Sequence, residues 1–344
     1  MVLNRQVRHR GFIWFCTPDG LSRCEVPPYV NVLLRLLGFA AAFITLALVP
    51  GAAKGQEYQL RHYGVADGLA HGAVLSIYQD RKGYMWFSTR EGLSRFDGYN
   101  FVNYGERDGL EQQLINDVTE DKQGRIWVAT NGAGVALFLG DGQVKLAKKF
   151  KSFLVVNGGD SKGKNNVNRL LADSRNNLWA LTDNGLFRAS LSDVELQFEA
   201  IKTESMSYES NAALEDRRGR LWFGYGYELV EVNEGRLINH GAVEQERPSP
   251  IMSIVEDSAG KILVANQYGL YEFVSPASQG QRGQWRKLEL NLKPKQNIRR
   301  VLVDSAGDLY VGTNVGLVKR RKDGRQAEIY ERRGRTVRDR HADP

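Results

Sequence analysis

Residues 74–93 read VLSIYQDRKGYMWFSTREGL, and this stretch decides the fold because its pattern returns five more times along the chain. The shared feature is an aspartate followed six residues later by tryptophan or another large apolar residue, at Asp80/Trp86, Asp121/Trp127, Asp173/Trp179, Asp216/Trp222, Asp257/Leu263 and Asp304/Tyr310. Successive aspartates lie between 41 (80 to 121) and 52 (121 to 173) residues apart. Repeats of this length are typical of the blades of a β-propeller.

Each unit divides into strands and turns. In Asp-x-x-Gly, the carboxylate can accept backbone N–H groups across a turn, while glycine, or Asn176 in the third unit, tolerates a positive φ. Apolar residues six and three positions before the aspartate predict an inner strand. A β-rich run such as 84–87 predicts a second strand, and a Gly-Leu pair such as 92–93 begins a third. A fourth strand is visible in the first two units, where 101–110 repeats 60–69.

We therefore predict an all-β fold over residues 57–319. The expected architecture is a β-propeller of about six to seven four-stranded blades, closed or incomplete, preceded by an apolar signal or anchor helix. Because closed propellers usually share a strand between their two ends, the strand near residues 58–63 is expected to pair with the C-terminal segment. The repeated tryptophans are interpreted as core residues that pack blade against blade.

The unit Val-x-x-Ile-x-x-Asp-x-x-Gly-x-x-Trp-x-x-Thr-x-x-Gly-Leu resembles the two-component regulator propeller repeat. The likeness extends over about residues 57–319 and is best between Val74 and Leu93. The resemblance implies the periplasmic ligand-binding sensor region of a bacterial hybrid histidine kinase or diguanylate cyclase. No histidine-kinase, cyclase or helix-turn-helix motif occurs in these residues, so we expect an N-terminal fragment whose output module lies elsewhere.

The first 56 residues are expected to direct export. Residues 1–30 form a leader or reflect a misassigned start, and residues 31–56 form a signal peptide or N-terminal anchor. An apolar run, 36–49, follows Arg35 and precedes the small residues 51–53, as in a signal peptide. The run is shorter than the roughly 20 residues of a membrane span, so a retained anchor is the second reading. Both readings place the propeller in the periplasm or on the outer face of the inner membrane.

Residues 320–344 are expected to form a charged tail, because the repeat ends at Lys319 where the family pattern would supply a further blade. A truncated or frameshifted gene product and a natural short form both fit this ending. The net charge of +7 comes from the two ends. Residues 1–56 carry 6 − 2 = +4 and residues 319–344 carry 10 − 5 = +5, which leaves 7 − 4 − 5 = −2 for the propeller. A near-neutral propeller excludes nucleic acid as a partner.

Catalytic chemistry has little support in the sequence. The propeller holds His62, His71 and His240, far apart and without metal-ligand spacing, and both cysteines, Cys16 and Cys24, lie in the leader. We therefore predict no catalytic residues, no metal, no cofactor and no enzyme activity in this chain. A propeller lyase is the less favoured alternative, because some propellers with similar repeats act as lyases.

Ligand binding is better supported, because a propeller gathers its variable loops around the mouth of a central channel. The repeat phase selects polar and aromatic residues in the turns between second and third strands, with one blade-connecting loop: Arg90, Asn131, Asp183, Tyr225, Gln267, Asn314 and His71. Amides, guanidinium and aromatic rings recognise sugar hydroxyls or a peptide backbone. The expected partners are a small-molecule, glycan or peptide-like ligand and a membrane signalling module or second copy. A free-standing exported interaction scaffold is the alternative.

Overall fold

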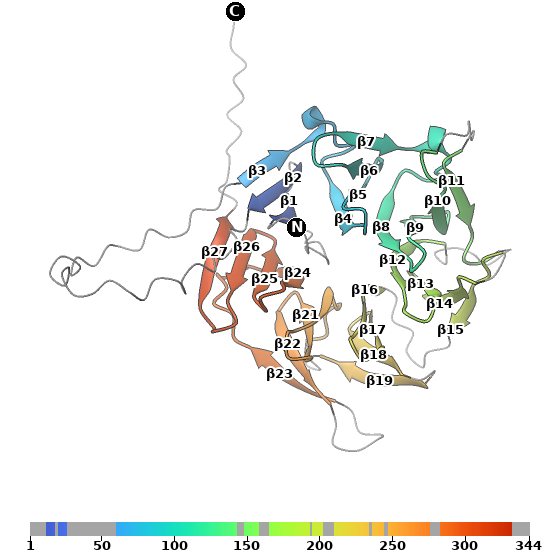
Figure 1. Cartoon of the computed structure of the whole chain (residues 1–344). Coiled ribbons are helices and arrows are strands. Elements are labelled where there is room, and N and C mark those ends of the chain that lie inside the picture. The colour runs from blue at the N-terminus through green and yellow to red at the C-terminus, as the bar shows by residue number, and fades with distance from the viewer. Residues whose placement is uncertain are drawn as a thin grey trace, which may run out of the picture.

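The computed structural model describes residues 12–17, 20–25, 60–142, 148–157, 165–192, 195–201, 210–233, 236–243, 247–275 and 283–331. These residues form six four-stranded antiparallel sheets and one three-stranded sheet around a central channel (Figure 1). Within the described ranges the only helices are two short 3-10 turns, η1 (Val65–Asp67) and η2 (Glu106–Asp108). The prediction of an all-β propeller with about six to seven four-stranded blades is therefore confirmed, and six such blades are described.

Each blade runs outward from the channel in sequence order, so its first strand is the innermost (Figure 1). Blades 1 to 3 comprise β4 (Val74–Gln79), β5 (Met85–Thr89), β6 (Gly92–Phe96), β7 (Phe101–Tyr104); β8 (Ile115–Glu120), β9 (Ile126–Thr130), β10 (Val135–Phe138), β11 (Phe150–Phe153); β12 (Val167–Ala172), β13 (Asn177–Thr182), β14 (Gly185–Ser190) and β15 (Glu199–Ile201). Blades 4 to 6 comprise β16 (Ser210–Glu215), β17 (Leu221–Tyr225), β18 (Glu228–Asn233), β19 (Arg236–Ala242); β20 (Ser253–Glu256), β21 (Ile262–Asn266), β22 (Gly269–Val274), β23 (Gln284–Leu288); β24 (Ile298–Val303), β25 (Leu309–Thr313), β26 (Gly316–Arg320) and β27 (Gln326–Glu331).

A three-stranded sheet lies in the ring between blade 6 and blade 1 (Figure 1). It consists of β1 (Phe12–Thr17), β2 (Gly20–Glu25) and β3 (Leu60–Tyr63), with β2 in the middle. Leu21 and Tyr63 pack in one cluster with Val74 and Phe87 of blade 1. We call this unit the N-terminal sheet.

The N-terminal sheet differs from two expectations. The partner of β3 is β2, not a C-terminal strand, and residues expected in a separate leader contribute two strands to the ring. The physical basis is local, since residues 12–17 (FIWFCT) are rich in aromatic and β-branched side chains and Pro-Asp-Gly at 18–20 is a turn sequence. The predicted signal or anchor segment, 31–56, lies outside the described residues.

The other end of the chain differs as well. The charged tail was expected to begin at residue 320, yet β27 pairs with β26 as the fourth strand of blade 6. The two strands are joined by a turn in which Arg321 N and Arg325 O lie 2.7 Å apart and Gly324 has a φ of 88°. Asp-Gly at 323–324 is a strong hairpin sequence, and the surrounding lysines and arginines obscured it.

The six-residue spacing of the repeat has a direct cause in the structure. One oxygen of the Asp80 carboxylate accepts the backbone N–H of Tyr84 at 2.9 Å and closes the turn. The other oxygen accepts the indole N–H of Trp86 at 2.8 Å. The same indole bond forms in the next three blades at 2.8 to 2.9 Å. Each of these carboxylates therefore fixes both a tight turn and a core tryptophan, and Asn176, with a φ of 65°, fills the glycine position as predicted.

The hydrophobic core is divided into clusters between neighbouring blades. Trp86 of blade 1 packs with Ile115, Val118 and Val128 of blade 2, and Trp222 of blade 4 packs with Ile251 of blade 5. Trp127 and Trp179 likewise lie in clusters with residues of the following blade. Each tryptophan therefore joins its own blade to the next one, as the interpretation of core residues required.

Polar bonds also join neighbouring blades, at the side of the ring that bears the Asp-x-x-Gly turns. The residue just before the aspartate is a glutamate in blades 2, 4 and 5, and its carboxylate accepts a backbone N–H from the preceding blade's turn. Glu120 accepts from Arg81, Glu215 from Ser174 and Glu256 from Arg217, at 2.8 to 2.9 Å. Blades 3 and 6 carry Ala172 and Val303 at this position. The junction of blades 2 and 3 and the junction of blades 5 and 6 therefore lack this bond and need others.

A buried ion pair in blade 6 makes the stability depend on pH. The Lys319 ammonium lies 2.8 Å from a carboxylate oxygen of Asp308, and both side chains are largely buried. Burial alone raises the pKa of the Asp308 carboxyl, but the hydrogen bond and charge of Lys319 outweigh it, and the net pKa is lowered. The resulting stabilisation is present above the unfolded-state pKa and is lost as the pH falls through the lower folded-state pKa.

We expect Asp308→Asn to lower the free energy of unfolding near neutral pH, because Lys319 then loses its carboxylate partner. The difference from wild type should shrink as the pH falls below the unfolded-state pKa of about 3.9, because the wild-type carboxyl is then protonated too. Urea unfolding of both proteins across the acidic range measures it. A difference that is the same at neutral and acidic pH would contradict the assignment.

Candidate functional site

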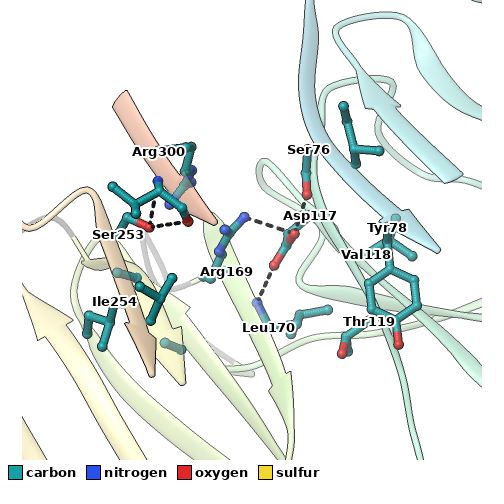
Figure 2. A pocket seen from close by; sticks show the side chains of 15 residues that line it. Ser76, Tyr78, Asp117, Val118, Thr119, Arg169, Leu170, Ser253, Ile254 and Arg300 are labelled. Carbon is teal, nitrogen blue, oxygen red and sulfur yellow. Dashed lines mark hydrogen bonds and ion pairs between the residues drawn. The ribbon is translucent and has the colours of Figure 1, made fainter. Parts of the chain in front are cut away.

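The central channel contains a ring of side chains from all six inner strands. They stand four residues before each turn aspartate, and they are Ser76, Asp117, Arg169, Ala212, Ser253 and Arg300. With neighbouring strand residues they line a cavity of about 50 Å³ (Figure 2). We call this ring the channel neck.

Asp117 makes the hydrogen bonds that connect the inner strands of blades 1, 2 and 3. One of its carboxylate oxygens accepts the Ser76 hydroxyl at 2.6 Å and the Arg169 guanidinium at 3.0 Å. The other oxygen accepts the backbone N–H of Leu170 at 3.0 Å. Asp117 thus joins blades 1, 2 and 3, and it spans the junction of blades 2 and 3, where Ala172 replaces the glutamate (Figure 2).

Arg300 and Ser253 make the hydrogen bonds that connect the inner strands of blades 4, 5 and 6. Arg300 of blade 6 donates to the carbonyl oxygen of Asn211 in blade 4 at 3.1 Å and to that of Met252. The Ser253 hydroxyl oxygen accepts the backbone N–H of Val301 at 3.2 Å and so spans the junction of blades 5 and 6. The two junctions without a glutamate on the turn side are therefore both bonded at the neck.

Two residues further along the strands, Tyr78, Thr119 and Val255 also line the cavity. Burial, reinforced by the negative charge of Glu120, raises the pKa of the Tyr78 hydroxyl to about 12. This phenol is therefore neutral at neutral pH and adds no charge to the channel. The charged groups among the described lining residues are Asp117, Arg169 and Arg300, with a formal sum of +1.

The residues predicted to bind ligand lie at one end of the ring. Pairing of Val74 with Thr89 places the start of each inner strand beside the end of the second strand. The turns after the second strand and the loops between blades therefore share this end, which we call the upper face. The Asp-x-x-Gly turns lie on the opposite, lower face. Two residues of strand separate the neck from the upper end of β4, or about 7 Å.

Blade 1 carries two candidates on the upper face, Arg90 and His71, which have different surroundings. The Arg90 side chain is exposed. The His71 ring nitrogen Nε2 lies 3.9 Å from the carboxylate of Glu91, and Nδ1 accepts the backbone N–H of Ala73 at 2.9 Å. Arg90, Glu91 and His71 thus form a small charged group at the upper face of blade 1.

Blades 2 and 3 connect two more candidates through a shared neighbour. Asn131 forms a β-bridge with Asn166, whose side-chain amide donates to Asp183 at 2.8 Å. The other oxygen of Asp183 accepts the amide of Asn168 at 2.8 Å. Asp183 is therefore held by amides of its own blade. In blade 6, Asn314 is similarly engaged, since it accepts from Asn297 N at 2.8 Å and donates to Lys295 O at 3.1 Å.

In blades 4 and 5, the exposed aromatic residues are not the predicted Tyr225 but two other tyrosines. Tyr225 is only 7% exposed and packs in the cluster between blades 3 and 4, whereas Tyr227 and Tyr268 are 40% and 44% exposed. Tyr227 and Tyr268 stand at the same position of successive repeats. The half-buried Gln267 directly precedes Tyr268. The two tyrosines add two aromatic rings to the upper face. None of the seven predicted residues lines the neck cavity.

The neck was missed by the sequence reasoning. A usable signal was present, because the position four residues before the aspartate varies among acid, base, hydroxyl and alanine, whereas the position after it is apolar in every unit. In the described part of the chain, no group of three or more histidine, cysteine, aspartate or glutamate residues is arranged to hold a metal ion. The described residues also contain no helix long and apolar enough to cross a membrane.

The family model of the two component regulator propeller matches residues 68–91 and 109–132. Each match covers a loop between blades and the first two strands of a blade. The resemblance inferred from the repeat is thereby confirmed. A 66-residue stretch is also 30% identical to Histidine kinase P4 of Formosa agariphila, over 19% of this chain and 5% of the kinase.

Solved structures with a similar fold include the extracellular domains of two hybrid two-component systems from B. thetaiotaomicron. One has a TM-score of 0.70 at 18% identity and aligns over 96% of this chain and 41% of its own. The other has a TM-score of 0.58 at 20% identity, over 80% and 36%. This chain therefore spans about two fifths of the length of these domains.

An enzyme shares the fold as well. A catalytically inactive variant of virginiamycin B lyase from Staphylococcus aureus, solved with quinupristin, has a TM-score of 0.64 at 13% identity, over 91% of both chains. Identities this low show the propeller fold alone. Sensor and lyase functions occur on one architecture, so the function of this chain has to be argued from its own residues.

Proposed function

We propose that this chain is the ligand-sensing propeller of a bacterial receptor in two-component or cyclic-di-GMP signalling. The ligand, a glycan or a peptide-like molecule, binds on the upper face, and the signal passes to a membrane-linked output module. The observation that carries the proposal is the contrast between the two faces. Repeated polar groups of the lower face close turns and join blades, whereas the upper face presents exposed side chains outside the repeat pattern, namely Arg90, Tyr227 and Tyr268.

The exposed groups of the upper face have complementary chemistry. Arg90, Glu91 and His71 offer charge and hydrogen bonds on blade 1, and Tyr227 and Tyr268 offer two aromatic rings on blades 4 and 5. Asn131, Gln267 and Asn314 add amides between these groups. Aromatic rings that stack and polar groups that donate and accept are the combination with which proteins recognise sugars and extended peptides.

The receptor context supports the same function. Two repeats match the regulator propeller family, and a histidine kinase and extracellular domains of two-component systems are among the similar proteins. We place the propeller in the periplasm or on the outer face of the inner membrane. We further propose that a histidine kinase or a diguanylate cyclase module, with or without dimerisation, carries the output.

We expect Arg90→Ala to weaken binding of the ligand about tenfold or more, the scale of a hydrogen bond to a charged group. Titration of a library of oligosaccharides and peptides by calorimetry first identifies the ligand on the wild-type chain. Lys82→Ala is the matched control, because Lys82 is also an exposed cation of blade 1 but lies in the turn on the lower face. It should bind like wild type.

Tyr227→Ala and Tyr268→Ala test the part of the upper face that belongs to blades 4 and 5. Each should weaken binding without lowering the thermal stability, since both rings are exposed. Binding that survives all three upper-face substitutions would refute the proposed site. If such binding were lost on changing Tyr99, which is 88% exposed between β6 and β7, the outer rim would be the contact surface, as in an interaction scaffold.

A further inference from the structure

We propose that the channel neck binds one carboxylate group, held between the guanidinium groups of Arg169 and Arg300. Both arginines line the same cavity, and Arg169 lies between Arg300 and Asp117 (Figure 2). Arginine presents its donors in a planar fork that matches the two oxygens of a carboxylate. The proposal rests on the function above only for the source of the carboxylate, because a free anion would use the same site.

Unused donors point to a ligand at this place. The Arg169 side chain is 15% exposed, and among the described residues its one recorded hydrogen bond goes from Nη1 to Asp117. A guanidinium carries five N–H groups, so most of its donors are left for the cavity. The bonds that a carboxylate accepts from a guanidinium are charge-assisted and about twice as strong as bonds between neutral groups, so a carboxylate can displace water from these donors.

The charge balance selects the sign of the ligand. Two guanidiniums and one carboxylate surround the cavity, which leaves a formal +1 among the described lining residues. The carboxylate of Asp117 is already engaged by a hydroxyl, a guanidinium and a backbone N–H. A second carboxylate on the side facing Arg300 would balance the neck, and a cation would be repelled.

The size of the cavity limits the group that fits. One water occupies about 10 to 15 Å³ by this measure, so a cavity of about 50 Å³ holds a group of roughly three to five non-hydrogen atoms. A carboxylate has three. The remainder of a larger molecule would extend toward the upper face, where a sugar ring or a peptide terminus can meet the exposed tyrosines.

The position of the site gives binding a structural consequence. Asp117 joins blades 1 to 3 and Arg300 joins blades 4 to 6, while Arg169 belongs to blade 3. A carboxylate that contacts both arginines would connect these two sets of blades across the channel. Occupation of the neck would thereby change the coupling between halves of the ring, which is a route by which a small ligand can alter a propeller.

The test is calorimetric titration of the full chain with sodium acetate, sodium glucuronate and glucose. Wild type should bind acetate saturably, and Arg300→Gln and Arg169→Gln should each weaken that binding at least tenfold. Arg218→Gln is the matched control, because it removes the same charge from an exposed turn on the lower face, and it should bind as wild type does. Equal responses of all four proteins would overturn the site.

Two further arms complete the test. If Arg169→Gln does not fold, the neutral pair Asp117→Asn/Arg169→Gln replaces it and should also fail to bind acetate; retained binding overturns the proposal. Glucuronate that binds more tightly than acetate, with the excess lost in Tyr227→Ala, assigns the carboxylate to a ligand of the upper face, and equal affinities assign it to a free anion. Glucose binding without any acetate binding would refute the neck site and leave the proposed function standing.

Discussion

Trp222→Ala is expected to lower the free energy of unfolding by about 3 to 5 kcal/mol, the usual scale for removing a buried aromatic side chain. The indole is fully buried between blades 4 and 5, with its ring 5.3 Å from that of Phe273. The substitution also leaves the Asp216 carboxylate without the indole N–H that it accepts at 2.9 Å. Urea unfolding followed by circular dichroism measures the loss.

Two controls separate the contributions. Trp222→Phe keeps an aromatic ring but removes the N–H, so its loss should be smaller, on the order of 1 to 2 kcal/mol. Tyr99→Ala removes an exposed ring and should change the stability by less than about 0.5 kcal/mol. A loss below about 1 kcal/mol for Trp222→Ala would show that the tryptophans do not join the blades.

Asp117→Ala is the second substitution with a large expected effect, again about 3 to 5 kcal/mol. The Arg169 guanidinium would remain in the channel without its partner. The Ser76 hydroxyl and the Leu170 N–H would lose their acceptor too. The junction of blades 2 and 3 would be weakened most, because Ala172 supplies no glutamate there.

A double-mutant cycle tests this explanation. Arg169→Met removes the cation and keeps an extended side chain, so Asp117→Ala/Arg169→Met should be more stable than Asp117→Ala alone. Thermal and urea unfolding of the four proteins give the coupling energy. If the two costs simply add, the charge of Arg169 is not what makes the loss of Asp117 expensive.

The repeated part of the fold was predictable because its signals are local. A carboxylate that closes a turn and also accepts an indole N–H has to stand six residues before the tryptophan, so the spacing in the sequence reports a contact in space. Pairing of β2 with β3 was not predictable in this way, because residues 26–59 separate the two strands and no repeat marks them. β27 was hidden by its charged neighbours.

The upper-face site was only partly accessible to the same reasoning. Position in the repeat located the correct turns, but Tyr225 stands one residue earlier than the other turn candidates, at the position that Thr89 and Thr130 hold elsewhere. That position faces the core between blades, and Thr89 uses it to donate to Gly92 O at 2.7 Å. Burial of Tyr225 follows from this phase, whereas Tyr227 is exposed because it lies in the turn after β17 ends at Tyr225. That the seven predicted residues bind ligand remains a prediction.

The packing of each repeated tryptophan against the next blade bears on how the chain folds while it is synthesised. A polypeptide that is synthesised from its N-terminus delivers the blades one at a time, and the packing of Trp86, Trp127, Trp179 and Trp222 is completed by the blade that follows each of them. While the chain is being synthesised, the tryptophan of the last completed blade is therefore partly uncovered. Chaperones that shield apolar surface have a defined target at each step, and aggregation should be most sensitive to a pause between blades.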